Sequence, residues 1–173
     1  MTSKITKILS DEHQNILKVV ETLDDRCNQV QSGEEIDRKF FLDTINFIRN
    51  YADKFHHAKE EEILFKELCK PGVEMHCNPI EMMLYEHEQG RNFVKEMEQG
   101  VKEENKTKII SGARGYIQLI KEHIFKEDNI LYPMADEALN KKTQQEMLKR
   151  FEKVEREKRE DKKKYLNFVR SLK

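Results

Sequence analysis

Four histidines fall on the apolar faces of segments with helical spacing: His13, His56, His87 and His123. In a helical hairpin, two residues lie at one level when the turn is midway between them. The midpoint of His13 and His56 is position 34.5, beside Gly33, and the midpoint of His87 and His123 is Asn105. Both positions lie in stretches that interrupt the apolar pattern. We therefore expect the four imidazoles to meet at one end of a bundle. A single histidine in a core is usually only a hydrogen-bonded packing residue, but four at one level indicate a site.

Two of these histidines begin the spacing His-x-x-x-Glu, which places both side chains on one helix face. The pairs are His56–Glu60 and His123–Glu127. They belong to an internal repeat, because FHHAKEEEILF aligns with EHIFKEDNILYP when His56 is set on His123. Each half of the chain thus supplies one helix with a single histidine and one with the pair. The repeat predicts four imidazoles and two carboxylates in one core.

The neighbouring pair His57–Glu61 has the same spacing and is a rival register. The angular position of each residue around the helix can be counted from Ala52, near the centre of the apolar stripe, at about 100° per residue. His56 and Glu60 then lie roughly 40° and 80° away, whereas His57 and Glu61 lie roughly 140° and 180° away. This phase predicts that His57 and Glu61 face solvent.

Buried carboxylates of this kind need a compensating cation, because two ionised carboxylates in an apolar core are very unfavourable alone. No cysteine lies on the inner positions near these residues, which argues against structural zinc. Imidazoles with bridging carboxylates suit a pair of iron or manganese ions. Two six-coordinate metals need about twelve bonds, and four histidines, two bridging carboxylates and a bridging oxo or hydroxo group leave roughly one position open on each. We expect two iron ions, with manganese or zinc less favoured, that bind a diatomic or peroxide ligand.

The elements that position these residues are long amphipathic helices, since apolar residues recur at intervals of three and four. We expect helices at about 9–30, 34–69, 80–101, 109–134 and 142–172. Short turns make the first four antiparallel neighbours, so the predicted fold class is all-α: an up-down-up-down four-helix bundle with an additional C-terminal helix. The bundle takes residues 1–140. Residues 141–173 form the C-terminal helix, which has charges at the middle of its seam and packs at its two ends.

Composition limits the classes of partner. The 173 residues carry 32 Lys+Arg and 33 Asp+Glu, a net charge of −1, which argues against a nucleic-acid or anionic-membrane binder. No apolar run approaches the ~20 residues of a membrane span, and the N-terminal stretch lacks the pattern of a signal peptide. Three cysteines without a C-x-x-C motif suggest no disulfide framework, so we expect a cytoplasmic protein. A dimer through the C-terminal helix stays open.

The chain resembles the hemerythrin-like family, a cation-binding domain with a His-His-Glu pattern. The matching stretches are DEHQNIL, FHHAKEEEILF, NPIEMMLYEHEQGR and LIKEHIFKEDNILYP, which cover about residues 8–138 in the right order. The resemblance implies a four-helix bundle around a non-haem di-iron centre. By position it carries metal-ligand roles onto His13, His56, Glu60, His87, His123 and Glu127.

The chain differs from the oxygen-carrying members of this family in two ways. Oxygen-carrying members have a fifth histidine four residues after that of the third helix, where this chain has Arg91. Without that ligand both metals keep exchangeable positions, which favours a sensor or a reactive centre over a plain oxygen carrier. Their last motif is His-x-x-x-x-Asp, which His123 and Asp128 also satisfy, so Asp128 stays an alternative to Glu127.

Three functions remain in competition. The first is a di-iron module that binds, senses or handles dioxygen, nitric oxide, peroxide or iron. The second is a di-iron oxidoreductase that turns over peroxide, dioxygen or nitric oxide. The third is a metal-free helical scaffold or interaction protein, which the matched histidine levels and the internal repeat disfavour.

Overall fold

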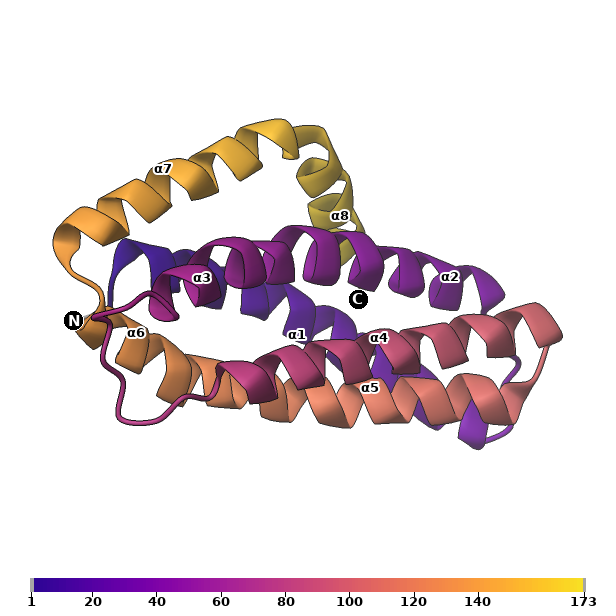
Figure 1. Cartoon of the computed structure of the whole chain (residues 1–173). Helices are drawn as coiled ribbons and strands as arrows, with labels where there is room; N and C mark the ends of the chain where they lie inside the picture. Colours follow the sequence, from indigo (N-terminus) through magenta and orange to yellow (C-terminus); the bar gives the residue numbers. More distant parts are fainter. Residues whose placement is uncertain (1, 173) are drawn as a thin grey trace.

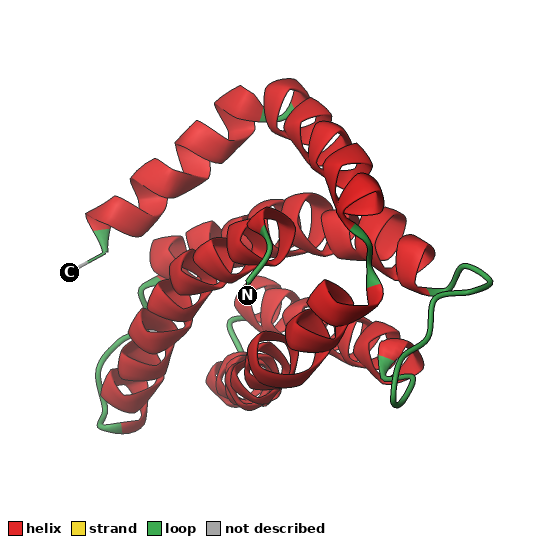
Figure 2. Cartoon of the chain, turned by 90° about the vertical axis from the view of Figure 1, so that its left-hand side faces the viewer, coloured by secondary structure: helices red, strands yellow, loops and turns green. Residues whose placement is uncertain are grey.

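Helices form all the regular structure of this protein, whose computed structural model describes residues 2–172; no strand occurs in that range (Figure 2). Four long helical segments run up and down beside one another (Figure 1). They are α1 (Lys4–Gln31), the run α2 (Arg38–Phe47), η1 (Ile48–His57), η2 (Glu60–Leu64) and α3 (Phe65–Leu68), then α4 (Ile80–Glu103), and the run α5 (Lys106–Lys126), η3 (Glu127–Leu131) and α6 (Tyr132–Ala138). The predicted all-α bundle is confirmed.

Short polar side chains start four of the helices. Each accepts a hydrogen bond from a backbone N–H three residues on, which is the standard way of satisfying the exposed donors of a helix N-terminus. The pairs are Ser3 with Thr6, Asp37 with Phe40, Asn105 with Lys108 and Asn140 with Thr143. The caps at Asp37 and Asn105 place the turns beside positions 34 and 105, where the histidine levels require them.

The C-terminal part of the chain differs from the prediction of one helix over about 142–172. It forms two helices, α7 (Lys141–Glu157) and α8 (Arg159–Ser171), which meet at a bend at Lys158 (Figure 1). The seam of this segment is charged at its middle, so nothing apolar holds it straight there. The bend lets Met147 and Phe151 of α7 pack in one apolar cluster, while Tyr165 and Val169 of α8 pack in another.

The apolar core is divided into two clusters. The larger lies toward the turns near positions 34 and 105 and includes Ile16, Phe41 and Met97. The smaller closes the opposite end and includes Leu9 and Leu64. Along α1, His13 lies between Leu9 and Ile16, so the layer of histidines has apolar packing on both sides rather than an open bundle end.

Helices α4 and α5 approach closely through glycines. A Cβ built on Gly112 would lie 2.6 Å from the backbone nitrogen of Met97 and 2.8 Å from the carbonyl oxygen of Phe93. A Cβ on Gly100 would lie 2.6 Å from the backbone nitrogen of Ile109. Both approaches are to backbone, which cannot move aside as a flexible side chain can.

We therefore expect Gly112→Ala to lower the free energy of unfolding by about 1–3 kcal/mol, the usual effect of overpacking. Gly90→Ala is the matched control, because its Cβ would meet the Tyr116 ring at an ordinary 3.6 Å. The control should be neutral or stabilising by up to about 1 kcal/mol, the helix propensity difference between the residues. Urea denaturation of both variants checks this, and equal effects would contradict the close approach.

Candidate metal centre

Seven ionisable side chains form a buried layer where the four helical segments meet. None is more than 6 % exposed: His13, His56, His57, Glu60, His87, His123 and Glu127. The six residues predicted from the sequence are all in this layer. The matched levels are confirmed as well, since the ring centroids of His13 and His56 lie 4.6 Å apart and those of His87 and His123 lie 4.8 Å apart.

The layer divides into two groups of the kind that hold a metal ion. In each group one ligand atom per residue lies within 4.8 Å of the others. The first group is His13, His56, Glu60 and Glu127, and the second is His57, His87 and His123. This division has room for two adjacent metal ions, one in each group.

The two carboxylates face both groups. One oxygen of Glu127 lies 3.2 Å from Nε2 of His13 in the first group, and its other oxygen lies 3.2 Å from Nε2 of His123 in the second. Glu60 behaves similarly, because its Oε2 lies 3.6 Å from Nε2 of His56 and 3.6 Å from Nε2 of His87. Each carboxylate is therefore placed to bridge two cations.

Four of the five histidines form a hydrogen bond through Nδ1 with a carboxylate on the outer side, whereas Nδ1 of the fifth, His57, is too far from its nearest carboxylate for one. Such outer partners fix the orientation of a metal-binding imidazole and raise its basicity. The Nδ1–oxygen distances are 3.0 Å for His13 to Asp128, 2.9 Å for His56 to Glu12, 3.7 Å for His57 to Asp53, 2.7 Å for His87 to Glu61 and 2.8 Å for His123 to Glu86. Asp128, the alternative to Glu127, thus lies on the outer side of His13, where Ser10 also donates to it at 2.6 Å.

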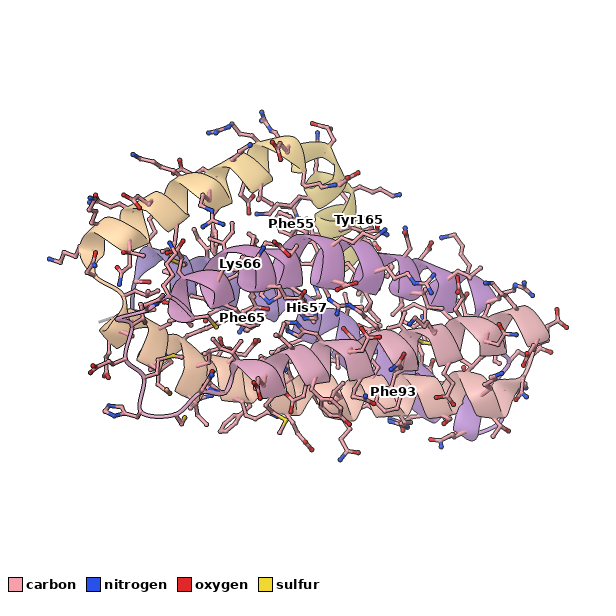
Figure 3. All side chains as sticks on the ribbon, in the orientation of Figure 1. Phe55, His57, Phe65, Lys66, Phe93 and Tyr165 are labelled. Atoms are coloured by element: carbon pink, nitrogen blue, oxygen red, sulfur yellow. The ribbon has the colours of Figure 1, made fainter. Side chains whose placement is uncertain are left out.

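The prediction that His57 faces solvent is wrong. His57 is buried, and its ring stacks on that of His87 at a centroid distance of 3.8 Å; Figure 3 shows it between the segment 38–68 and α4. The reason is the backbone, which is π-helical over Ile48–His57 and again over Glu60–Leu64. The N–H of Ala58, for example, bonds to the carbonyl of Asp53, five residues earlier. Each such turn holds about one more residue, so the phase of 100° per residue does not apply.

Glu61 is also placed differently from the prediction. It is half-buried and accepts hydrogen bonds from Nδ1 of His87 and from the guanidinium of Arg91, both at 2.7 Å. Arg91 donates to Asp53 as well, at 2.7 Å. The position where oxygen carriers have a histidine therefore holds an arginine that fixes the carboxylates behind His57 and His87.

Tyr132 is a site residue that the sequence did not reveal. Its hydroxyl donates to Glu60 Oε1 at 2.5 Å and lies 3.3 Å from His13 Nε2. The internal repeat aligns Tyr132 with Phe65. The replacement of an apolar ring by one with a hydroxyl was the sequence signal that could have indicated a role for Tyr132. Tyr132 therefore engages one oxygen of Glu60 and leaves the other, Oε2, facing His56 and His87.

The protonation states follow from the geometry. Burial, with the charge of Glu127, holds the pKa of Glu60 well above its usual range. Although burial opposes it, the charge of His123 and contacts with both His123 and His13 hold the pKa of Glu127 well below its usual range. Burial likewise disfavours the imidazolium forms, but contacts with Asp128 and Glu127 raise the pKa of His13 to about 9. Glu127 and Glu86 raise the pKa of His123 to about 10.

These directions predict that metal binding near pH 7 releases about three protons, from His13, His123 and Glu60, because metal ligands bind deprotonated. Affinity should therefore fall as pH is lowered. Calorimetric titration with Fe²⁺ under anaerobic conditions, in buffers of different ionisation enthalpy, counts the protons. Release of fewer than two would contradict this protonation pattern.

The donor set fits a pair of metal ions. Within the residues that the structure describes, His56 Nε2, Glu60 Oε2 and both oxygens of Glu127 are buried and make no hydrogen bond. A buried polar atom without a partner costs about 1–3 kcal/mol, and more when charged. These orphaned atoms all belong to the two groups, so cations between the groups would satisfy them together.

A helical bundle with histidines and carboxylates converging in its core defines a metal-binding four-helix protein. The family model of the hemerythrin HHE cation binding domain matches residues 4–135, and the chain belongs to this family. No curated protein and no solved structure matches the chain. None of the helices in residues 2–172 is both long enough and apolar enough to cross a membrane.

Proposed function

We propose that the chain holds two iron ions and binds a small ligand there, dioxygen, nitric oxide or peroxide, as a non-haem di-iron module. On this proposal His13 and His56 would hold one ion, the histidines of the other group would hold the second, and Glu60 and Glu127 would contribute carboxylate oxygens to both. The observation that carries the proposal is the placement of Glu127 between His13 and His123, both of its oxygens lacking hydrogen bonds among the described residues.

The two groups contain different numbers of histidines, which favours ligand binding over turnover. With His57 the set has five imidazoles, where the sequence indicated four, so fewer than the two exchangeable positions expected above remain. The group of His13 and His56 has one imidazole fewer than the other group, and we assign the exchangeable position to its side. A limited opening suits reversible binding of one small ligand more than turnover of a larger substrate.

Bound iron would supply reversible electron transfer and Lewis acidity at this layer. The chain's residues keep the imidazoles oriented through their outer carboxylates, pack apolar side chains on both sides of the layer and hold a proton close by. That proton lies on the hydroxyl of Tyr132, which donates to Glu60. The same hydroxyl lies 3.3 Å from Nε2 of His13.

The test combines metal analysis with optical titration. Protein expressed with iron available should contain close to two iron equivalents per chain. After anaerobic reduction, one equivalent of dioxygen, nitric oxide or peroxide should give a stable optical adduct. Continuous consumption of peroxide or nitric oxide would favour the oxidoreductase instead, and a single zinc ion held away from these residues would overturn the proposal.

Replacement of His57 should reduce the iron content. We expect His57→Ala to lose at least half of the iron, because it removes one of three imidazoles from its group. His76→Ala is the matched control, since His76 is exposed in the connector between α3 and α4, and it should keep both equivalents. Elemental analysis of both variants decides whether His57 is a ligand or only packs against His87.

A further inference from the structure

A cavity of about 370 Å³ lies beside the three-histidine group and opens between the segment 38–68 and helices α4 and α5. His57, His87 and His123 form one side of it. Its volume is within the range of pockets that take small organic molecules. A diatomic ligand needs far less room, so the proposed iron centre does not account for this space.

The wall of the cavity is apolar. Ile48, Val94, Leu119 and Ile120 line it, with Gly90 between them on α4. A Cβ on Gly90 would touch only the side chains of Tyr116 and Leu119, at 3.6 Å and 3.7 Å. Gly90 therefore keeps the cavity open rather than permitting a close helix approach, in contrast to Gly112.

The rim of the cavity is basic. Arg49, Lys54, Arg91 and Lys95 line it, against two carboxylates, Asp53 and Glu86. Both carboxylates are already engaged, Asp53 by Arg91 and Glu86 by His123 and Lys126. Lys54 is exposed and makes no ion pair with any residue in 2–172. Arg49 pairs with Glu98, Arg91 with Asp53 and Glu61, and Lys95 lies 3.8 Å from Glu88. Among the described residues of the rim, Lys54 is therefore the cation without a carboxylate partner.

Tyr116 lines the cavity and carries an uncommitted polar atom. Tyr116 is 2 % exposed, and its hydroxyl has no hydrogen-bond partner among the described residues. A buried hydroxyl of this kind costs free energy unless something fills the space beside it. Apolar pockets with a few placed polar groups are typical of small-molecule sites, and Tyr116 gives this pocket such a group.

We propose that the cavity binds a small amphipathic organic anion, its apolar body against Val94, Leu119 and Ile120 and its anionic end at Lys54 on the rim. This site is separate from the exchangeable position assigned to the side of His13 and His56. It therefore goes beyond the proposed binding of small ligands at the metals.

Four probes test the chemistry by calorimetric titration of the full chain as isolated: octanoate, 1-octanol, octyltrimethylammonium and acetate. Octanoate should bind at one site per chain, at least fivefold more tightly than 1-octanol, and octyltrimethylammonium should not bind. Acetate has the same carboxylate group without the long alkyl chain. If acetate binds as tightly as octanoate, the carboxylate is at the metals and the proposal is overturned.

Variants place the two ends of the ligand. Lys54→Glu should weaken octanoate binding at least threefold, and Lys149→Glu, the same charge change on exposed α7, should leave it unchanged. Gly90→Leu should abolish binding by filling the cavity, whereas Gly90→Ala should largely keep it. Equal affinities for Lys54→Glu and Lys149→Glu would overturn the assignment of the rim. A larger loss in Tyr116→Phe than in Lys54→Glu would put the carboxylate inside and overturn the orientation.

Iron content, measured on the same samples, separates the two proposals. Octanoate binding by a chain with two iron equivalents supports both. Octanoate binding by a folded chain without iron supports the cavity and contradicts the metal centre. Iron without octanoate binding leaves the metal centre standing and overturns the cavity.

Discussion

Replacing Glu127 with alanine is expected to remove most of both metal equivalents from the chain. Its two oxygens face His13 in one group and His123 in the other, each at 3.2 Å, so one substitution removes a ligand from both positions. It also removes the charge that raises the pKa of His13 and His123. Iron analysis after desalting measures the loss, which should exceed that of any single histidine variant.

Asp128→Asn is the matched control for this experiment. Asp128 contacts Nδ1 of His13 from outside the centre, so its replacement should weaken metal binding by about 10–100-fold, the usual effect of an outer partner. The iron content should then stay near that of the parent when free iron is in excess. Equal losses in the two variants would contradict the assignment of Glu127 as the bridging residue.

Lys59→Met is expected to lower the free energy of unfolding by about 3–5 kcal/mol, the cost of leaving a buried charge without its partner. Lys59 is fully buried, makes an ion pair with Glu12 and lies 3.2 Å from Glu155 of α7. Its ammonium also lies 3.9 Å from the centre of the Phe55 ring. Methionine keeps an unbranched side chain that is one heavy atom shorter, so most of the measured loss reports the charge.

Lys66→Met, about two helical turns further along, measures the contribution of an exposed ion pair for comparison. Lys66 pairs with Glu62 four residues earlier, both side chains more than half exposed; Figure 3 shows Lys66 on the outer side of its helix. This variant should lose about 0.3–0.5 kcal/mol. Denaturation of both variants at equal iron content makes the comparison, and similar losses would contradict a special role for the buried lysine.

The effect of Lys59→Met should also depend on pH. Burial raises the pKa of Glu12 above its usual value even against the charge of Lys59, and removing the lysine raises the pKa further. A carboxyl whose pKa is higher in the folded state takes up a proton on folding, so stability falls as pH rises above the unfolded value. The variant should therefore be more strongly destabilised at pH 8 than at pH 5.

The sequence was sufficient for the fold and for most of the layer because both depend on spacing. Intervals of three and four residues predicted the helices, and the midpoints 34.5 and 105 predicted which histidines share a level. Those inferences need only the length of each helix and the position of each turn. His13, His56, His87 and His123 accordingly lie together in the structure.

What the sequence could not supply were departures from regular geometry. The π-helical run over Ile48–His57 turns His57 inward, and propensities for an α-helix carry no sign of it. The bend at Lys158 depends on how α7 and α8 pack on the bundle, which the charged seam of that segment does not specify. Tyr132 reaches Glu60 across 72 residues of sequence, a contact that spacing within one helix cannot predict.

The π-helical turns set how this chain tolerates insertions and deletions. One such turn begins at Glu60 and another at Glu127, over Glu60–Leu64 and Glu127–Leu131, and the N–H that closes each turn bonds to the carbonyl of its first residue. Deleting one residue inside either turn would restore α-helical phase and rotate every later side chain by about 100°, which exchanges core and surface positions. The connector between α3 and α4 has no such phase to keep. Length variation in natural or engineered relatives should therefore accumulate in that connector and be absent from the two turns.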